Sequence, residues 1–410
     1  MTDVTGENSG NCKNGKSDEG GKSGKLQPKL RFKGFTDAWE QRALGELIPH
    51  KRVTVNPVSG TYYRLWSIPS YDAGNPELVD GNQIKSTKQI VQNNDVLLGK
   101  INPRINRVWV VAIQPLDLAI NIASTEWIIF RSTTNNSFDP YFILSFLSAP
   151  NTRTRLMSEV TGATGSQKRF QPASIAQHPY YTSSLPEQEC IGSLFRCLDS
   201  LIAAAERKAR LLRKKKHAYL NHIFTQHLRF TGHTTPWHQQ AFKELVSRQS
   251  KTNGFSLLPT VEYEDIIPGE GRLNKNIYKK KKGKHGVLFQ QGDILFGKLR
   301  PYLKNWVFAE FDGIAVGDFW VLRRLTGMNN RFLFFLIQSP SFEAVSSLST
   351  GTKMPRADWN LVSNTLFSIP TEQAEIARFF QTLDSLIAAA ERKVSLLKKR
   401  KQAYLQKMFV

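Results

Sequence analysis

The sequence predicts an α+β fold: two mixed α/β domains, called head 1 and head 2, are separated by two long helices that form an antiparallel coiled coil. Two observations predict it. A segment with helical periodicity occurs twice, at residues 187–224 and 372–409, with 23 of 38 positions identical. Shorter segments ahead of each copy also match, at residues 31–47 and 229–245. A duplication of head plus helix predicts a pseudo-twofold internal repeat.

The predicted boundaries follow from composition and from the repeat. The first residues contain almost no apolar side chains, which is typical of a disordered tail. Pro186 and Pro370 suit helix starts, because proline lacks only a donor that the first turn leaves unpaired. The predicted segments are a polar tail at 1–28, head 1 at 29–185, a spacer helix at 186–228, head 2 at 229–369 and a second spacer helix at 370–410.

The repeated segment carries a coiled-coil seam, because apolar residues alternate at spacings of four and three for more than four heptads. At 1.5 Å per residue the seam is roughly 50 Å long, which indicates a spacer. Lys216 and Lys401 occupy matched seam positions, where a device that sets the register and a snorkelling lysine fit equally. The apolar seam positions are Ile191, Phe195, Leu198, Ile202, Ala205, Ala209, Leu212, Tyr219 and Ile223, then Ile376, Phe380, Leu383, Ile387, Ala390, Val394, Leu397, Tyr404 and Met408.

Connectivity favours an antiparallel pair of helices. Only residues 225–228 separate the first helix from head 2, so head 2 begins at the far end of that helix. The simplest return path then runs back along the first helix. A parallel pair stays open, because a head of about 140 residues could carry the chain back.

Charge and composition indicate a partner. The 56 lysines and arginines exceed the 34 acidic residues by 22, and the isoelectric point is near 9.9. This excess favours a polyanion. No stretch of 18 apolar residues occurs, so nucleic acid is favoured over membrane lipid and a cytoplasmic location is expected. Cys12, Cys190 and Cys197 lack metal spacing and are interpreted as free thiols.

The chain contains secondary-structure patterns in its heads and two short motifs that resemble catalytic sequences. β-rich runs at 106–113 and 314–322 and helical runs at 140–147 and 331–338 predict mixed heads, without a strand order. Gly292, Gly297 and Lys298 have phosphate-loop spacing, but Leu299 stands where a metal-binding hydroxyl is needed. Glu206 and Glu391 each begin a Glu-x-Lys that resembles the end of a nuclease metal motif, although both lie on the seam helices as a charged face. We predict no catalytic residue and no metal ligand.

These motifs together resemble the specificity subunit of type I restriction-modification enzymes, over residues 29–410. The resemblance rests on duplicated elements in a fixed order: the head opening Arg-Phe-x-Gly, an Asp-[Ile/Val]-Leu-x-Gly-Lys-x-x-Pro element, a Thr-Gly-[Ser/Thr] loop ending in arginine, and the helix containing LDSLIAAAERK. The chain departs from the pattern in its polar N-terminal extension and in Asn94, where head 2 has Gly292.

The resemblance implies a function and partners. Each head would be a target recognition domain that reads one half of a bipartite double-stranded DNA sequence, and the helices would be spacers. Two modification subunits would bring S-adenosylmethionine, and two restriction subunits would use ATP and Mg²⁺. This chain would bind none of these cofactors and would catalyse nothing by itself. Half-sites about 34 Å apart, one turn of DNA, would suit such a spacer and leave several base pairs unread.

Candidate DNA contacts are one tyrosine and the basic residues near turns and loops, because arginine and lysine read guanine or bind phosphate. For Lys100 and Lys298, DNA contact and a solvated strand end fit equally. The lysine run at 279–284 is interpreted mainly as a solvated loop, and Trp39 and Trp237 as core residues. The candidates are Tyr63, Arg64, Lys100, Arg104, Arg107, Lys168, Arg169, Lys279, Lys280, Lys281, Lys282, Lys284, Lys298, Arg300, Lys304, Lys353 and Arg356.

The outward faces of the helices are expected to offer matched surfaces to two partner subunits. These surfaces include Arg207, Lys214, Arg392 and Lys399. Two other functions stay open: a self-sufficient metal-dependent endonuclease, and an architectural DNA binder without sequence preference. The heads diverge between their matched parts, as residues 53–72 beside 251–270 show. This divergence argues against both, because only a sequence reader needs two different heads.

Overall fold

A computed structural model describes residues 27–49, 51–133, 137–164, 167–253, 257–280, 283–348 and 354–409. The chain divides into two compact units. Unit 1 runs to Ala205 and adds Lys393–Val410, and unit 2 is Glu206–Arg392. Each unit therefore holds one head together with part of each long helix. Nearly all of the predicted N-terminal tail, with Cys12, lies outside the described residues, whereas Cys190 and Cys197 are free and exposed as expected.

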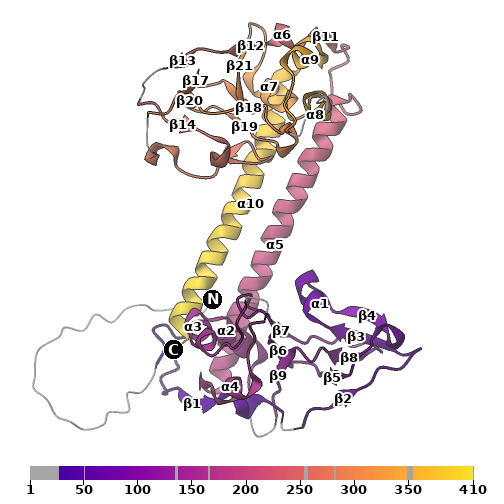
Figure 1. Cartoon of the computed structure of the whole chain (residues 1–410), viewed down its shortest axis with the longest axis vertical. Coiled ribbons are helices and arrows are strands. Elements are labelled where there is room, and N and C mark those ends of the chain that lie inside the picture. Colours follow the sequence, from indigo (N-terminus) through magenta and orange to yellow (C-terminus); the bar gives the residue numbers. More distant parts are fainter. Residues whose placement is uncertain are drawn as a thin grey trace, which may run out of the picture. The chain divides into compact units, whose positions relative to one another are not determined.

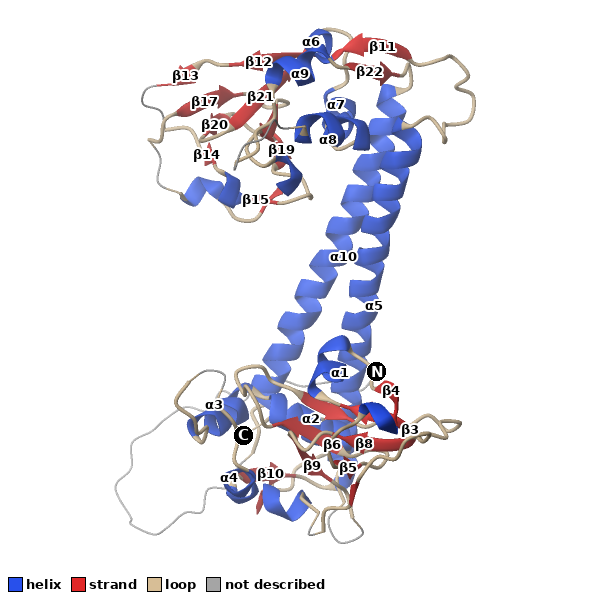
Figure 2. Cartoon of the chain, turned by 45° about the vertical axis from the view of Figure 1, so that its right-hand side comes forward, coloured by secondary structure: helices blue, strands red, loops and turns tan. Residues whose placement is uncertain are grey.

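The described residues of head 1 form three sheets (Figures 1 and 2). The largest has the strand order β2-β5-β8-β3-β4, in which β3 and β8 are parallel. The second has the order β7-β6-β9, and β1 pairs with β10 to bring the two ends of the head together. The strands are β1 (Glu40–Ala43), β2 (Thr54–Val55), β3 (Tyr62–Trp66), β4 (Glu77–Asp80), β5 (Lys88–Ile90), β6 (Val96–Gly99), β7 (Val108–Val110), β8 (Ile120–Ala123), β9 (Trp127–Phe130) and β10 (Pro179–Thr182).

Head 2 repeats this plan with additions. The order β19-β18-β21 matches β7-β6-β9 and gains β12, while β13-β17-β20-β14 again contains a parallel pair, β14 with β20. A separate hairpin, β15-β16, belongs to head 2. The strands are β11 (His238–Ala241), β12 (Val246–Gln249), β13 (Thr252–Asn253), β14 (Thr260–Val261), β15 (Ile266–Ile267), β16 (Arg272–Leu273), β17 (Gly286–Phe289), β18 (Ile294–Gly297), β19 (Trp306–Phe308), β20 (Gly313–Ala315), β21 (Phe319–Arg324) and β22 (Leu366–Ile369).

Short helices pack beside these sheets, and two long helices leave the heads. The predicted helical runs are confirmed by α2 and α7, whereas the run at 314–322 holds two strands that Gly317, at φ 101°, separates. The helices are α1 (Ile68–Ala73), α2 (Pro140–Ser148), α3 (Pro150–Ser158), α4 (Pro172–Gln177), α5 (Leu185–Phe224), α6 (Phe242–Leu245), α7 (Asn330–Leu336), α8 (Pro340–Ser347), α9 (Trp359–Asn364) and α10 (Gln373–Met408), with 3-10 turns η1 (Leu44–Leu47), η2 (Gly81–Gln83), η3 (Tyr263–Asp265), η4 (Ile277–Lys279) and η5 (Pro301–Leu303).

The helix starts differ between the two copies. Pro186 lies in the first turn of α5, as predicted. The expectation for Pro370 is wrong, because α10 begins three residues later, at Gln373. Pro370 instead follows β22, and the backbone oxygen of Glu372 accepts the first hydrogen bonds of the helix, from Glu375 and Ile376.

The central strand of each head is buried on both faces. Because successive side chains of a strand point to opposite faces, Val96 and Leu98 of β6 enter one core cluster while Leu97 enters another. In the same way, Ile294 and Phe296 of β18 enter one core cluster and Leu295 enters another. In each head, one cluster includes residues of both α5 and α10, so the head and its helix ends share a core.

Within each unit, α5 and α10 pack together in opposite directions. In unit 1, Phe195 contacts Phe409, with ring centroids 6.0 Å apart, and Asp199 pairs with Lys401 at 2.6 Å. Figure 1 shows the C-terminus, in yellow, beside the start of α5. In unit 2, Phe224 stacks near Phe380 with centroids 6.4 Å apart. All predicted seam residues are buried or half-buried.

Candidate nucleic-acid interface

In head 1, backbone hydrogen bonds join the turn after β6 to the loop that ends in Arg169. The amide of Asn102 donates to the oxygen of Lys168 at 3.1 Å, and the amide of Phe170 donates to the oxygen of Lys100 at 2.9 Å. Ile101 and Arg169 form the antiparallel bridge between the two segments. Two basic motifs that are far apart in the sequence therefore form one surface, called basic corner 1 (residues 100–104, 161–164 and 167–170).

Head 2 builds the same unit, called basic corner 2 (residues 298–304 and 354–357). The amide of Arg300 donates to the oxygen of Pro355 at 2.8 Å, and that of Ala357 donates to Lys298 at 2.8 Å. Leu299 and Arg356 form the matching bridge. The two corners thus share one hydrogen-bond pattern although their side chains differ.

Three cations of corner 1, namely Arg104, Lys168 and Arg169, have no carboxylate partner among the residues that the structure describes. Arg104 and Arg169 are exposed, and Lys168 is half-buried. Burial lowers the pKa of Lys100, and the nearby Arg52 and Arg169 lower it further, whereas Glu126 opposes this. A lysine with a lowered pKa beside other cations is stabilised by an added anion. The corner is therefore suited to a phosphate group.

Corner 2 is more nearly neutral. Lys298 lies 3.6 Å and Arg356 3.0 Å from Asp318, so this one carboxylate faces two cations. The hydroxyl of Tyr263 donates to the backbone oxygen of Asp318 at 2.6 Å, and burial raises the pKa of Tyr263 to about 12. Arg300 is exposed and has no carboxylate partner among the described residues.

Two candidates in head 1, Tyr63 and Arg107, are corrected by the structure, whereas Arg64 remains a prediction. Tyr63 is 2% exposed and belongs to a core cluster, so its ring cannot reach DNA. Arg64 pairs with Asp117 at 3.0 Å. Arg107 is 8% exposed and pairs with Asp72 at 2.9 Å. The buried guanidinium of Arg107 requires this counter-ion, whereas the Arg64 side chain keeps 28% of its surface exposed.

Two described lysines of the run, and the nearby Lys304, form ion pairs in head 2. Lys280 pairs with Glu262 and Asp265, and Lys284 with Glu262. Lys304 pairs with Glu343 at 2.7 Å. The remaining described member, Lys279, is exposed. Lys281, Lys282 and Lys353 lie outside the described residues.

The phosphate-loop spacing does not form a phosphate loop. Ile294–Gly297 is the buried strand β18, and the amide of Gly297 already bonds to Asn305 at 2.7 Å. Gly292 has φ 93°, and its head 1 equivalent Asn94 has φ 70°. Asparagine tolerates this left-handed conformation better than other side chains, so the departure at Asn94 preserves the turn.

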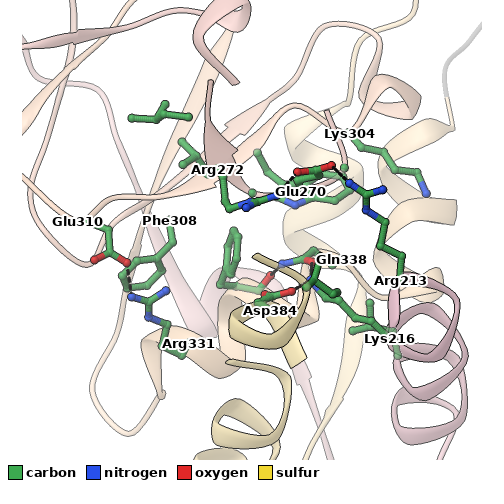
Figure 3. Close-up of a pocket in the computed structure, with 18 of the residues that line it drawn as sticks. Arg213, Lys216, Glu270, Arg272, Lys304, Phe308, Glu310, Arg331, Gln338 and Asp384 are labelled. Carbon is green, nitrogen blue, oxygen red and sulfur yellow. Dashed lines mark hydrogen bonds and ion pairs between the residues drawn. The ribbon is translucent and has the colours of Figure 1, made fainter. Parts of the chain in front are cut away.

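Unit 2 holds a pocket of about 490 Å³ between α5, α10 and the β15-β16 turn (Figure 3). Its charged side chains pair with one another: Arg213 with Glu270 at 2.7 Å, Lys216 with Asp384 at 2.7 Å, and Arg331 with Glu310. Glu391, beside the pocket, accepts from both Arg213 and Arg272. The Glu391 carboxylate is therefore engaged by two guanidinium groups.

The predicted core tryptophans are buried, and the predicted docking residues are exposed. Trp39 and Trp237 are 5% and 8% exposed, which confirms them as core residues. Arg207, Lys214, Arg392 and Lys399 are exposed on the long helices. Among the described residues, no group of three or more His, Cys, Asp or Glu could hold a metal ion. None of the helices described is long and apolar enough to cross a membrane.

The sequence interpretation missed Asn102. It lies in basic corner 1 at the position that Arg300 occupies in corner 2, 198 residues later. The duplication contained this signal, since the Gly-Lys-x-x-Pro elements align these two residues without a gap.

No protein-family model and no curated protein matches this chain. Several solved structures are similar to this chain. A chain of the structure described as "Structural basis underlying complex assembly and conformational transition of the type I R-M system" is 17% identical, with 90% of this chain and 96% of that chain covered and a TM-score of 0.55. The type I restriction-modification S subunit from M. genitalium is 12% identical, with 94% and 99% covered and a TM-score of 0.60.

A third structure, the HsdS subunit from Thermoanaerobacter tengcongensis, is 17% identical over 90% of this chain and 96% of that one, with a TM-score of 0.45. The first two likenesses extend over nearly the whole of both chains. At these identities they establish the fold. The chain therefore has the fold of the specificity subunits of type I restriction-modification systems.

Proposed function

We propose that this chain is the sequence-specific DNA-binding subunit of a type I restriction-modification complex, and that each head reads one half of a bipartite target. The observation that carries the proposal is the pair of basic corners. Each head uses the same strand, turn and loop to place cations on its surface, and the side chains differ between heads. One scaffold with two different sets of side chains suits two different half-sites.

The corners have the features that phosphate binding requires. Their cations attract the DNA backbone, and backbone contacts fix register without specifying sequence. Gly162 allows the corner 1 loop to fold tightly, because its φ is 115° and an added Cβ would lie 2.6 Å from the oxygen of Gln167. Base readout then needs donors and acceptors aimed into the major groove.

The long helices are proposed as the spacer and docking element. A continuous seam at spacings of four and three favours an antiparallel coiled coil. The exposed residues Arg207 and Lys214 on α5 match Arg392 and Lys399 on α10, which would give two modification subunits equivalent surfaces. S-adenosylmethionine, ATP and Mg²⁺ would then act on the partner subunits, and this chain would contribute recognition.

The proposal is tested by mapping modified adenines in a host strain with this gene and its modification partner, and in the same strain lacking this gene. We expect one methylated motif made of two short elements that flank several unread base pairs. The motif should disappear when this gene is removed. A continuous motif would contradict two separate readers, and DNA cleavage by the purified chain with Mg²⁺ alone would favour a nuclease instead.

A further inference from the structure

Asn102 and Arg300 occupy the same point of the two basic corners. Each is the fourth residue of a Gly-Lys-x-x-Pro turn, in which Gly99 or Gly297 is the first residue. Each donates its amide to the opposite loop, at 3.1 Å and 2.8 Å. Each also accepts from the amide three residues on, Ile105 or Leu303. Their Cα atoms are therefore held by the same local frame.

Both residues have left-handed backbone conformations. The φ angles are 46° at Asn102 and 49° at Arg300. Asparagine is one of the side chains that tolerates this region, whereas arginine is uncommon there and costs about 1 kcal/mol relative to glycine or asparagine. Asparagine or glycine would fit the turn at Arg300 better. A strained residue at a surface turn suggests that its side chain has a function.

Neither side chain is used to stabilise the fold in the described parts of the chain. Arg300 is exposed and Asn102 is half-buried, and neither donates or accepts a side-chain hydrogen bond there. Their neighbours differ in this respect: Lys298 and Arg356 face Asp318, and Lys304 pairs with Glu343. The polar groups of Asn102 and Arg300 are therefore available to a ligand.

We propose, on the basis of the proposed function, that Asn102 reads an adenine in the half-site of head 1 and Arg300 reads a guanine in the half-site of head 2. An asparagine amide matches N6 and N7 of adenine, and a guanidinium matches O6 and N7 of guanine. Base readout requires a side chain held at a defined point, which the hydrogen-bonded turn supplies. The surrounding cations of each corner bind phosphate and bring the turn to the groove.

The test is a binding selection from a library of random DNA duplexes. The full chain in complex with its modification partner binds the duplexes, and the bound sequences are read. Arg300→Asn should change one base of one half-site, from guanine towards adenine, by about tenfold or more in relative affinity. Asn102→Arg should change one base of the other half-site in the opposite sense. In both cases the remaining bases should stay as in the wild type.

Glycine variants separate side-chain readout from misfolding. Arg300→Gly and Asn102→Gly keep a residue that accepts φ near 50°, so thermal melting should be unchanged while the base preference at one position is lost. Gln226→Asn is the matched control, because Gln226 is also an exposed residue with a left-handed backbone, at φ 61°, but lies outside both basic corners. It should select the wild-type motif.

Two results would overturn the inference in distinguishable ways. If the variants select the wild-type motif with a uniform loss of affinity, the two residues contact phosphate and the proposed function stands. If the wild-type complex selects no split motif at all, the proposed function fails together with the inference.

Discussion

At the scale of single residues, one buried carboxylate anchors each head to the start of its following helix. Glu187 accepts from Arg31 at 2.7 Å and from the indole of Trp39 at 3.2 Å. Glu372 accepts from Arg229 at 2.8 Å and from Trp237 at 3.1 Å. Both carboxylates are almost fully buried. The sequence predicted the tryptophans as core residues, but it did not predict their partner, because that partner lies more than 130 residues away.

Glu372→Gln should lower the free energy of unfolding by about 3 kcal/mol, because it leaves a half-buried guanidinium without its counter-ion. Burial raises the pKa of Glu372, but hydrogen bonds from Arg229 and Trp237 outweigh it and the net pKa is lowered. A lowered pKa stabilises the fold above the unfolded-state value, about 4.3, and this stabilisation is lost as the pH falls below it. Urea titrations at neutral and acidic pH measure both effects.

Glu40→Gln is the control for this variant, because Glu40 is exposed and its ion pair in the described part of the chain is with the half-exposed Arg42. It should cost less than about 1 kcal/mol. A wild-type acid dependence that persists unchanged in Glu372→Gln would show that other carboxylates cause it.

At the scale of elements, each long helix pairs an aspartate with the seam lysine of the other copy. Lys216 lies 2.7 Å from Asp384, and Lys401 lies 2.6 Å from Asp199. These two contacts are equivalent in the repeat, because Lys401 lies 185 positions after Lys216 and Asp384 lies 185 positions after Asp199. They favour the register interpretation of the seam lysines. The two pairs differ in burial: the Lys216 side chain is 10% exposed and that of Lys401 is 23% exposed.

Asp384→Asn should therefore cost more than Asp199→Asn. We expect about 2 kcal/mol for Asp384→Asn, because the Lys216 ammonium would lose its carboxylate partner and keep the neutral contacts with Gln338 and the Phe335 ring. Asp199→Asn should cost less than about 1 kcal/mol, because its pair is more open to solvent. Hydrogen exchange of the amides in α5 and α10 measures the local stability in each unit. Equal and small effects would instead indicate lysines that snorkel to solvent.

At the scale of the whole molecule, duplication predicts stoichiometry. The exposed pair Arg207 and Arg392, and the pair Lys214 and Lys399, occupy matched positions of the repeat. Two copies of one partner can use two equivalent surfaces, whereas a single copy would leave one surface unused.

Native mass measurement of the saturated complex should therefore give two modification subunits per chain. A chain whose residues 229–369 are replaced by the second head of another such protein should retain this ratio, because its helices are unchanged. One modification subunit per chain at saturation would contradict two equivalent docking surfaces.

The sequence by itself determined the duplication, the long helices and the motifs that meet in the corners, because these depend on local periodicity and on matched spacing. The sequence also identified Arg300 as a candidate DNA contact, and the repeat aligns Arg300 with Asn102. Only the tertiary structure decided the strand orders and the left-handed turns. It also decided that Tyr63 is buried and that Arg107 is paired with Asp72. The physical reason is that burial and ion pairing depend on residues distant in the chain, and pattern alone does not reveal which distant residues meet.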